Sequence, residues 1–286
     1  MSELPLISVI TPTFNSSHTL RETIESILRQ NYPNCEHIIM DGGSTDGTLD
    51  ILREYAHLNW VSEKDKGHYD AMNRGILKAK GEVINILNSD DCYRPGALRL
   101  VGSAFSAHPE WDGLFGDVVY VDGESKEIFR RQEARWDYNV LRFGVAYVVH
   151  PTLFVRKSVH DRLGLFRNDR FLNACDYDFL LRLGKANCRI GHIPAFLINY
   201  RFHGHGQSAD SRVVRNSARE SEVLRREHGL PPGLLGRAYN LWYRLVRQGQ
   251  KLRYRGRCDL IPGNWILRSH LQPKTEFSSN AGVDKL

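Results

Sequence analysis

Long apolar runs are missing from this sequence. The longest, Ala146–Val149 and Ile193–Ile198, fall far short of the ~20 residues that a membrane-spanning helix needs. The chain opens with Met-Ser-Glu-Leu-Pro, which lacks the basic start and the apolar stretch of a signal peptide. We therefore expect neither a transmembrane helix nor a cleaved leader.

Cysteine is scarce, and the familiar nucleotide-binding motifs are missing or misplaced. The five cysteines, at positions 35, 92, 175, 188 and 258, form no CxxC pair. This predicts reduced thiols in a cytoplasmic protein, with no disulfide framework and no zinc site. No GxxxxGK[ST] segment occurs, so a P-loop is not expected. Residues 204–209 fit GxGxxA, but no strand with an acid follows, so we do not interpret them as a dinucleotide site.

The composition is that of an ordinary globular protein, but the charge is unevenly spread. The 286 residues are 41% hydrophobic and 25% charged, which suits one large α/β domain or two small ones. Residues 201–286 contain 16 Lys and Arg against 7 Asp and Glu. By difference from totals of 39 and 33, residues 1–200 contain 23 against 26. The basic last third predicts either an anion-binding surface or a solvated basic helix.

Short apolar segments alternate with helical patterns through the first ninety residues. Strands are predicted at 6–11, 36–40, 60–62 and 83–87, and helices at 18–30, 46–55 and 69–80, the last closed by Gly81. This alternation predicts right-handed βαβ units and a parallel sheet. Further on, we predict a hairpin of 114–121 with 127–131, strands at 152–155 and 189–200, and helices at 171–183 and 208–228.

Polar residues collect where the predicted strands end. The segments are Thr11–Asn15, Asp41–Gly47 and Asn88–Asp91. Because the carboxyl ends of parallel strands meet at one edge of a sheet, we expect these groups to share one ligand site. Paired acids there would suit a hard cation such as Mg²⁺ or Mn²⁺. Taken alone, Asp41–Gly47 could be only a turn, and Asp90-Asp91 only a capped helix start.

An ordered set of motifs carries a family resemblance. The chain contains ISVITPTFN (7–15), IIMDGGSTDGT (38–48), SEKDKGHYDAMNRG (62–75), GEVINILNSDD (81–91), HPTLFVRKSVHDRLGLF (150–166) and CDYDFLLRL (175–183). It resembles glycosyltransferase family 2, above all bacterial enzymes that build surface polysaccharide. The resemblance implies an α/β GT-A fold, a Rossmann-like, mainly parallel sheet flanked by helices. It implies a catalytic domain at 1–205, with a nucleotide-binding half at 1–91 and an acceptor half at 92–205, before a basic helical extension at 206–286.

The resemblance also implies a reaction and a donor site. The reaction is an inverting transfer of a sugar from a nucleotide sugar, most often a UDP-sugar, to a hydroxyl of a glycan or lipid-linked acceptor. Asp41 would receive the uracil or ribose, and Lys66 and Asp70 would lie near the ribose or diphosphate. The implied donor-binding residues are Pro12, Thr13, Asn15, Asp41, Lys66, Asp70, Asn88, Ser89 and Asp90.

A divalent cation, Mn²⁺ or Mg²⁺, is implied at the end of the fourth strand. Asp90 matches the final acid of the family's DxD motif, with Asp91 beside it, while Asn88 replaces the first acid and removes one negative charge. A late histidine ligand, His203 or His205, would tilt the choice toward Mn²⁺.

Asp176 matches the catalytic acid of the family's ED motif and is the predicted general base. Cys175 replaces the preceding Glu. Asp178 lies two residues along the helix and does not share a face with Asp176, so we predict that it caps the helix or pairs with Arg182. His150 either faces the acceptor or only packs. The substitutions at positions 88 and 175 leave open an inactive relative that binds a nucleotide sugar and acts as an assembly partner.

The basic tail predicts a membrane contact. No acid occurs between Gly229 and Arg257, whereas arginines, leucines, Trp242 and tyrosines recur at helical spacing. Residues 233–257 would bind an anionic membrane surface, or else pack on the catalytic domain with their arginines exposed. The first alternative places the protein in the cytoplasm, peripheral to the inner face of the cell membrane. No nucleic-acid motif occurs, so no nucleic-acid partner is expected.

Overall fold

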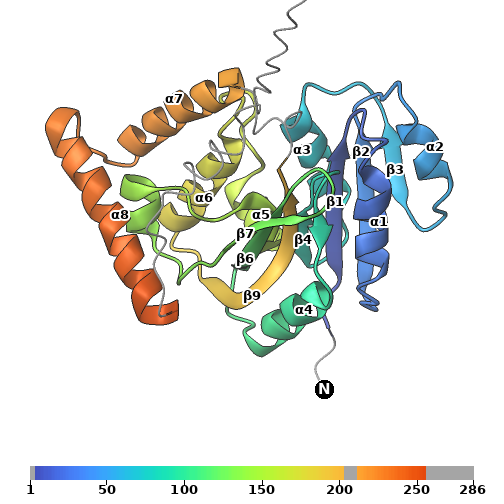
Figure 1. Cartoon of the computed structure of the whole chain (residues 1–286), viewed down its shortest axis with the longest axis horizontal. Coiled ribbons are helices and arrows are strands. Elements are labelled where there is room, and N and C mark those ends of the chain that lie inside the picture. The colour runs from blue at the N-terminus through green and yellow to red at the C-terminus, as the bar shows by residue number, and fades with distance from the viewer. Residues whose placement is uncertain (1–3, 203–210, 256–286) are drawn as a thin grey trace, which may run out of the picture.

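The computed structural model describes residues 4–202 and 211–255, arranged around one nine-stranded sheet (Figure 1). The strand order is β3-β2-β1-β4-β8-β6-β9-β5, with β7 paired to β6. The strands are β1 (Ile7–Thr13), β2 (Cys35–Asp41), β3 (Asn59–Ser62), β4 (Val83–Ile86), β5 (Cys92–Tyr93), β6 (Gly113–Val121), β7 (Glu127–Arg131), β8 (Leu153–Arg156) and β9 (Ile190–Arg201). The helices are α1 (Leu20–Leu28), α2 (Thr48–Arg53), α3 (His68–Lys78), α4 (Ala97–Ala107), α5 (Lys157–Leu163), α6 (Cys175–Lys185), α7 (Ser211–Glu227) and α8 (Gly233–Arg255), with short turns η1 (Val140–Gly144) and η2 (His150–Thr152).

The first half of the sheet is parallel, which confirms the predicted βαβ organisation. β1 pairs in parallel with β2 on one side and with β4 on the other, and β2 pairs in parallel with β3. Every residue of β1 and of β4 is buried, as expected for strands covered on both faces. The carboxyl ends of these strands therefore lie at one edge, and the polar segments that follow them start from there.

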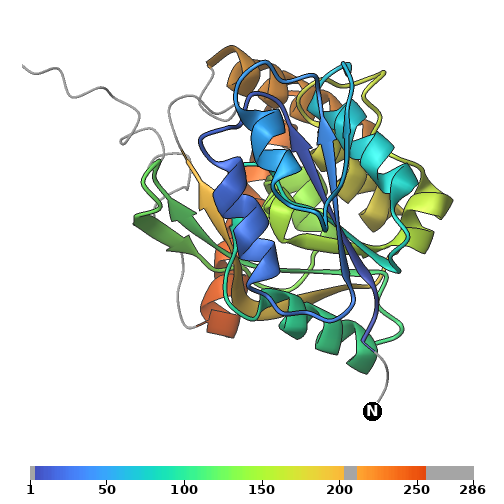
Figure 2. The ribbon, with the colours of Figure 1, turned by 90° about the vertical axis from the view of Figure 1, so that its right-hand side faces the viewer.

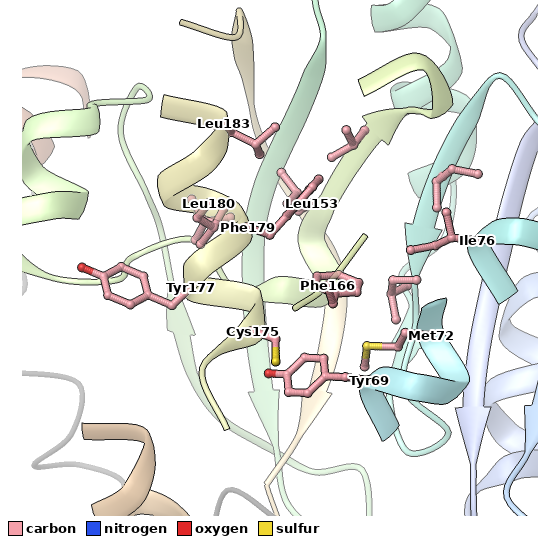
Figure 3. Packing of buried hydrophobic residues seen from close by; sticks show 14 of the residues in the cluster. Tyr69, Met72, Ile76, Leu153, Phe166, Cys175, Tyr177, Phe179, Leu180 and Leu183 are labelled. Carbon is pink, nitrogen blue, oxygen red and sulfur yellow. The ribbon is translucent and has the colours of Figure 1, made fainter. Parts of the chain in front are cut away.

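Two apolar layers cover the sheet, and the helices that contribute to them can be followed in Figure 2. One layer joins α3, α5 and α6 to the sheet through residues such as Met72, Val159 and Phe179. Figure 3 shows Met72 and Phe179 in this layer. The other joins α1 and α4 to the opposite side through Ile27 and Val101. Because both faces are filled, the sheet edge at the strand ends is left to bind a ligand.

The second half of the sheet is mixed. The predicted hairpin is present, since β6 and β7 pair antiparallel. β8 runs antiparallel to both β4 and β6, while β9 runs parallel to β6. β6 therefore points the same way as β4, and the carboxyl end of β9 reaches the same edge as the carboxyl end of β4. The two-residue strand β5 and the helices α4 and α5 were not predicted.

Gly81 does not close a helix in the way expected. The helix α3 ends at Lys78, with Ala79 as its C-cap residue, and Gly81 does not have a positive φ. A Cβ at position 81 would lie 2.5 Å from Ser8 Oγ and 2.8 Å from the Leu6 carbonyl oxygen. The position requires glycine because the chain passes close to β1, and not because of a left-handed cap.

Buried histidines lie within the sheet layers. His37 Nε2 lies 3.0 Å from Thr11 Oγ1, and burial lowers the pKa of His37 to about 3. The His160 ring stacks on Phe179 with ring centroids 4.7 Å apart, and burial lowers the pKa of His160 to about 3. Both imidazoles are therefore neutral in the folded protein at neutral pH.

The described chain ends in two helices, α7 and α8. α8 runs along the edge of the molecule farthest from β3 and α2 (Figure 1). Among the described residues, no helix combines the length and the apolar character needed to cross a membrane. The four cysteines in this part of the chain, at positions 35, 92, 175 and 188, are free.

Candidate active site

Asp41 organises the loop that follows β2. It is 2% exposed, and its carboxylate accepts hydrogen bonds from Gly43 N (3.0 Å), Ser44 N (3.0 Å), Ser44 Oγ (2.5 Å) and Ser62 Oγ (2.6 Å). These bonds hold the loop at the end of β2 and tie it to β3. The structure thus gives Asp41 a positioning role, and its contact with a base or ribose stays a prediction.

The segment after β1 is hydrogen-bonded to the same loop. Asn15, with φ 51°, donates its backbone N–H to Ser44 Oγ (2.7 Å) and accepts a hydrogen bond from Thr45 N (2.8 Å). Pro12 and Thr13 are buried, and Thr13 Oγ1 has no hydrogen-bond partner within the described structure. Because a buried hydroxyl without a partner is costly, this atom is a candidate contact for a ligand.

The Asn88–Asp91 loop joins the same edge. Ser89 Oγ lies 2.8 Å from Ser16 Oγ, which links this loop to the segment after β1. Asn88 Nδ2 donates to Asp91 Oδ2 (2.9 Å), which leaves the Asn88 amide oxygen as the atom that could meet a ligand. The Asp90 side chain is half-buried.

Asp91 is buried within the loop. It is 1% exposed, and its Oδ1 accepts a hydrogen bond from Arg201 N (2.9 Å) while Oδ2 accepts one from Asn88. Burial, with Asp90 close by, raises the pKa of Asp91 well above its usual range. Both Asp91 oxygens thus accept hydrogen bonds that hold the loop together, and its role as a metal ligand stays a prediction.

Arg201, the last residue of β9, is a positioning residue that sequence reasoning missed. Its side chain is buried and donates to the Asp90 carbonyl oxygen (3.0 Å), to the Gly123 carbonyl oxygen (2.9 Å) and to the Glu22 carboxylate. It thus ties the Asn88–Asp91 loop to the hairpin and to α1. Position 201 carried no motif, and the pairing of β9 with β6 and with β5 brings it here.

The segment before α3 runs from the loop after β2 toward α6. Lys66 is exposed, and its backbone N–H lies 3.3 Å from Asp70 Oδ2. A Cβ at Gly42 would lie 2.7 Å from Asp65 Oδ2, so glycine lets this segment approach the Asp41 loop. Lys66 and Asp70 therefore lie on a segment that touches the loop after β2, and their contact with a diphosphate stays a prediction.

Asp176 lies in the first turn of α6 and is held by α3. Tyr69 Oη donates to Asp176 Oδ1 (3.0 Å), and Tyr177 N donates to the same oxygen (2.8 Å). Two histidines lie close enough to interact electrostatically with this carboxylate. Burial lowers the pKa of His68 to about 4 and also lowers the pKa of His150. Both are therefore neutral at pH 7, and Asp176 has no cationic partner among them.

Asp178 and Cys175 have structural surroundings. Asp178 is fully buried, and its carboxylate pairs with Arg167 and with Arg182, whose Nε lies 2.9 Å from Oδ2. The predicted ion pair with Arg182 is confirmed. Cys175 is fully buried, its thiol donates to the Phe171 carbonyl oxygen (3.0 Å), and Figure 3 shows its sulfur among apolar side chains beside Tyr69.

A divalent cation fits the donor atoms at the end of β4. Asp90 offers a carboxylate and Asn88 an amide oxygen, which are the hard ligands that Mg²⁺ and Mn²⁺ prefer, and a substrate phosphate commonly completes such a site. Residues 4–202 and 211–255 contain no ready-made cluster of three or more His, Cys, Asp or Glu ligands. The predicted ligands His203 and His205 lie outside the described residues.

The comparisons with known proteins agree with this geometry. A family model described as glycosyl transferase family 2 matches residues 8–164, more than half of the chain. The chain belongs to glycosyltransferase family 2. The matched span includes the loops after β1, β2 and β4, and the predicted family and fold class are confirmed.

Curated relatives of this glycosyltransferase include bacterial proteins with named roles. A PGL/p-HBAD biosynthesis glycosyltransferase of Mycobacterium bovis is 34% identical over 188 residues, which are 62% of this chain and 69% of that protein. The O-antigen biosynthesis protein RfbC of Myxococcus xanthus is 33% identical over 232 residues, which are 78% of this chain and 18% of that protein.

Solved structures share the fold. S. aureus TarS 1–349 in complex with UDP-GlcNAc matches with TM-score 0.63 and 19% identity, over 87% of this chain and 73% of that chain. The mannosyltransferase PcManGT from Pyrobaculum calidifontis, in complex with GDP-Man and Mn²⁺, matches with TM-score 0.58 and 19% identity, over 94% and 80%. In another TarS structure, matched with TM-score 0.57 and 21% identity over 75% of this chain, the match spans 39% of that chain. At these identities the likeness shows the fold alone.

Proposed function

We propose that this glycosyltransferase moves a sugar from a nucleotide sugar to an acceptor hydroxyl with inversion at the anomeric carbon, and that Asp176 is the general base. The single observation that carries the proposal is the Tyr69–Asp176 contact of 3.0 Å. Tyr69 follows the Lys66 segment that meets the Asp41 loop, so the contact links the donor loops to a carboxylate on α6. A base opposite a donor site is what a direct displacement requires.

The surroundings of the two acids favour Asp176 over Asp178 as the base. Asp176 Oδ1 is held by two donors, which leaves Oδ2 to accept the proton of the acceptor hydroxyl. Asp178 is enclosed and neutralised by two arginines. A placed base typically contributes ~10²–10⁴-fold to the rate. No covalent intermediate is needed, because one carboxylate can deprotonate the acceptor as it attacks.

The donor is proposed to be a UDP-sugar bound along the edge formed by the loops after β1, β2 and β4. The Thr13 hydroxyl, buried without a partner within the described structure, is a candidate contact for this donor. Structural neighbours hold UDP-GlcNAc in one case and GDP-Man in another, so the base is to be tested directly.

Asp90 and Asn88 are proposed to hold Mn²⁺ or Mg²⁺ together with the donor diphosphate. When bound, the cation would offset the negative charge of the departing nucleoside diphosphate. Arg201 keeps the loop that carries both residues in place, through its bond to the Asp90 carbonyl oxygen.

The acceptor is proposed to be a glycan or a lipid-linked saccharide of the cell surface, and the enzyme to act in the cytoplasm at the inner face of the membrane. The relatives named for PGL/p-HBAD and O-antigen biosynthesis support this class of acceptor. The alternative of an inactive relative loses one of its two supports. Because the side chain at position 175 points into the core, the replacement of Glu by Cys there takes no carboxylate from the site.

The test combines donor binding with turnover. The wild-type protein is screened by thermal shift against UDP- and GDP-sugars with Mn²⁺, since a ligand that binds only the folded state raises the melting temperature. Asp176→Asn should keep the shift and lose transfer by about 10²–10⁴-fold. Asp161→Asn, an exposed acid on α5, is the control and should keep both.

Three outcomes would contradict the proposal. Wild-type turnover in Asp176→Asn would show that Asp176 is not the general base. A product with retained anomeric configuration, read by proton NMR, would exclude a direct displacement. Donor binding without hydrolysis or transfer on any glycan or lipid-linked acceptor would favour the inactive relative.

A further inference from the structure

The helix α8 is fixed to the catalytic domain by its polar side. Arg247 is 2% exposed, and its guanidinium donates to Glu133 Oε2 (2.7 Å) and to the Arg135 carbonyl oxygen (2.7 Å) while lying 3.5 Å above the Tyr147 ring. Lys251, one turn further, pairs with Glu133 Oε1 at 3.2 Å. Two of the basic residues of α8 therefore point inward and pair with the same buried carboxylate.

The inward contacts continue toward the start of the helix. Asn240 donates to the carbonyl oxygens of Phe143 (2.9 Å) and Gly144 (2.7 Å), and Tyr243 packs against Phe143 with ring centroids 5.2 Å apart. A Cβ at Gly144 would lie 3.1 Å from Tyr243 Cβ, so α8 and η1 approach closely. The orientation of α8 about its own axis is thus set by specific contacts along its length.

The outward side of α8 is apolar. Leu234 (81% exposed), Leu241 (61%), Trp242 (63%), Leu245 (58%) and Leu252 (56%) face solvent. A helix on the surface of a globular protein normally turns its apolar stripe inward and its charges outward. α8 instead exposes these apolar side chains while it buries Arg247 and Lys251. An exposed apolar stripe of this length is typical of a surface that meets another apolar phase.

The charges beside this stripe select the partner. Arg237, Arg244 and Arg253 are exposed along α8, and no acid occurs between residues 229 and 257. On α7, by contrast, Glu222 pairs with Arg226, so that helix carries both signs. Leucine and tryptophan flanked by arginine alone match the interface of an anionic bilayer, where apolar groups enter the acyl boundary and arginines meet phosphates.

We propose that the outward face of α8, from Leu234 to Tyr254, binds an anionic lipid bilayer directly. This deepens the membrane location given under the proposed function by naming the surface that makes the contact. It does not depend on the reaction, since vesicle binding requires no turnover. The ion pairs of Arg247 and Lys251 with Glu133 hold the apolar face outward, and the domain itself need not unfold to bind.

The experiment is co-sedimentation of the full chain with vesicles of equal parts phosphatidylcholine and phosphatidylglycerol, and with pure phosphatidylcholine vesicles. Binding is expected to the anionic vesicles and to weaken steeply between low salt and about 0.5 M salt, because screening shortens the reach of the arginines. Arg237→Gln with Arg244→Gln should weaken binding roughly 25-fold, about fivefold for each arginine. Leu241→Ser with Leu245→Ser should weaken it by at least about tenfold.

Matched controls change the same residue types elsewhere. Arg215→Gln with Arg219→Gln, on α7, removes the same charge, and Leu77→Ser with Leu100→Ser removes two other exposed leucines (70% and 47% exposed). Both controls should bind as the wild type does, and circular dichroism should show every variant folded.

Other results would overturn the proposal. One is no binding to anionic vesicles at low salt. Another is an equal loss in the α7 control, which would reduce the effect to net charge. A third is that the wild type does not bind vesicles but sediments as a dimer, and that Leu241→Ser with Leu245→Ser converts this dimer to a monomer. That result would assign the face to a second copy of the chain.

Discussion

Replacing Glu133 by glutamine should destabilise the protein far more than any surface change of the same kind. Glu133 is 2% exposed and lies among Arg131, Arg247 and Lys251. Glu133→Gln would remove this counter-charge from Arg247 and Lys251, which are buried, and from Arg131, which is half-buried. Breaking a buried ion pair from one side typically costs ~3–5 kcal/mol.

A second route to the magnitude uses proton linkage. Burial alone would raise the pKa of Glu133, but Arg131, Arg247 and Lys251 together lower it to about 2, from a usual value of 4.5. A depression of this size corresponds to about 3 kcal/mol of stability at pH 7. The two figures agree, and at 2–4 °C per kcal/mol they predict a fall in Tm of roughly 6–20 °C.

The assay is thermal unfolding followed by circular dichroism, with Glu127→Gln as the control. Glu127 pairs with Arg130 on the surface and should give no measurable change. Because the pKa of Glu133 is lower in the folded protein than in the unfolded chain, its contribution to the free energy of unfolding is fully present above pH 4.5. This contribution is lost only as the pH falls toward 2. The gap between wild type and Glu133→Gln should therefore stay constant from pH 6 to 8. An unchanged Tm in Glu133→Gln, or a gap that varies within that range, would refute the reasoning.

Two further predictions concern the active site. Tyr69→Phe removes a hydrogen-bond donor to the proposed base, so kcat should fall roughly tenfold or more with donor KM unchanged. Tyr32→Phe, which loses a bond to the Pro5 carbonyl, is the control, and a proportional loss in both variants would indicate a general packing effect. Asn88→Asp replaces the donor to Asp91 by a further acid, so the protein without cation should melt at a lower temperature. In thermal-shift titrations, Mn²⁺ should bind this variant roughly tenfold more tightly than the wild type. An unchanged Mn²⁺ response would show that position 88 is not part of the cation site.

Local patterns were enough to predict the parallel half of the sheet and the edge at which the loops after β1, β2 and β4 meet. The apolar runs at β1, β2 and β4 and the helices between them follow from burial on both faces, which the sequence expresses directly. The glycines and acids that follow these strands predicted where the loops begin. The helical spacing of residues 234–245 also predicted α8.

Contacts between distant positions could not be predicted in this way. Arg201 reaches Asp91 across 110 positions and Tyr69 reaches Asp176 across 107, and neither pair has a local signal. The inward direction of Asp91 could not be predicted, because a sequence does not tell whether an acid turns toward solvent or toward a backbone N–H. For α8, periodicity gave the apolar stripe but not its direction, which depends on Glu133, a residue more than a hundred positions away.

The neutral histidines set an acid limit on this fold. The pKa of His37 and of His160 is lowered by burial to about 3, and that of His68 to about 4, against 6.5 in an open chain. Below pH 6.5 these histidines bind protons in the unfolded chain but not in the folded protein. The free energy of unfolding therefore falls by about 1.4 kcal/mol per histidine for each pH unit. Three such groups exhaust a typical stability of roughly 5–15 kcal/mol within a few pH units. Acidification by a few pH units should thus unfold the enzyme before the Glu133 carboxylate, with a pKa of about 2, becomes protonated.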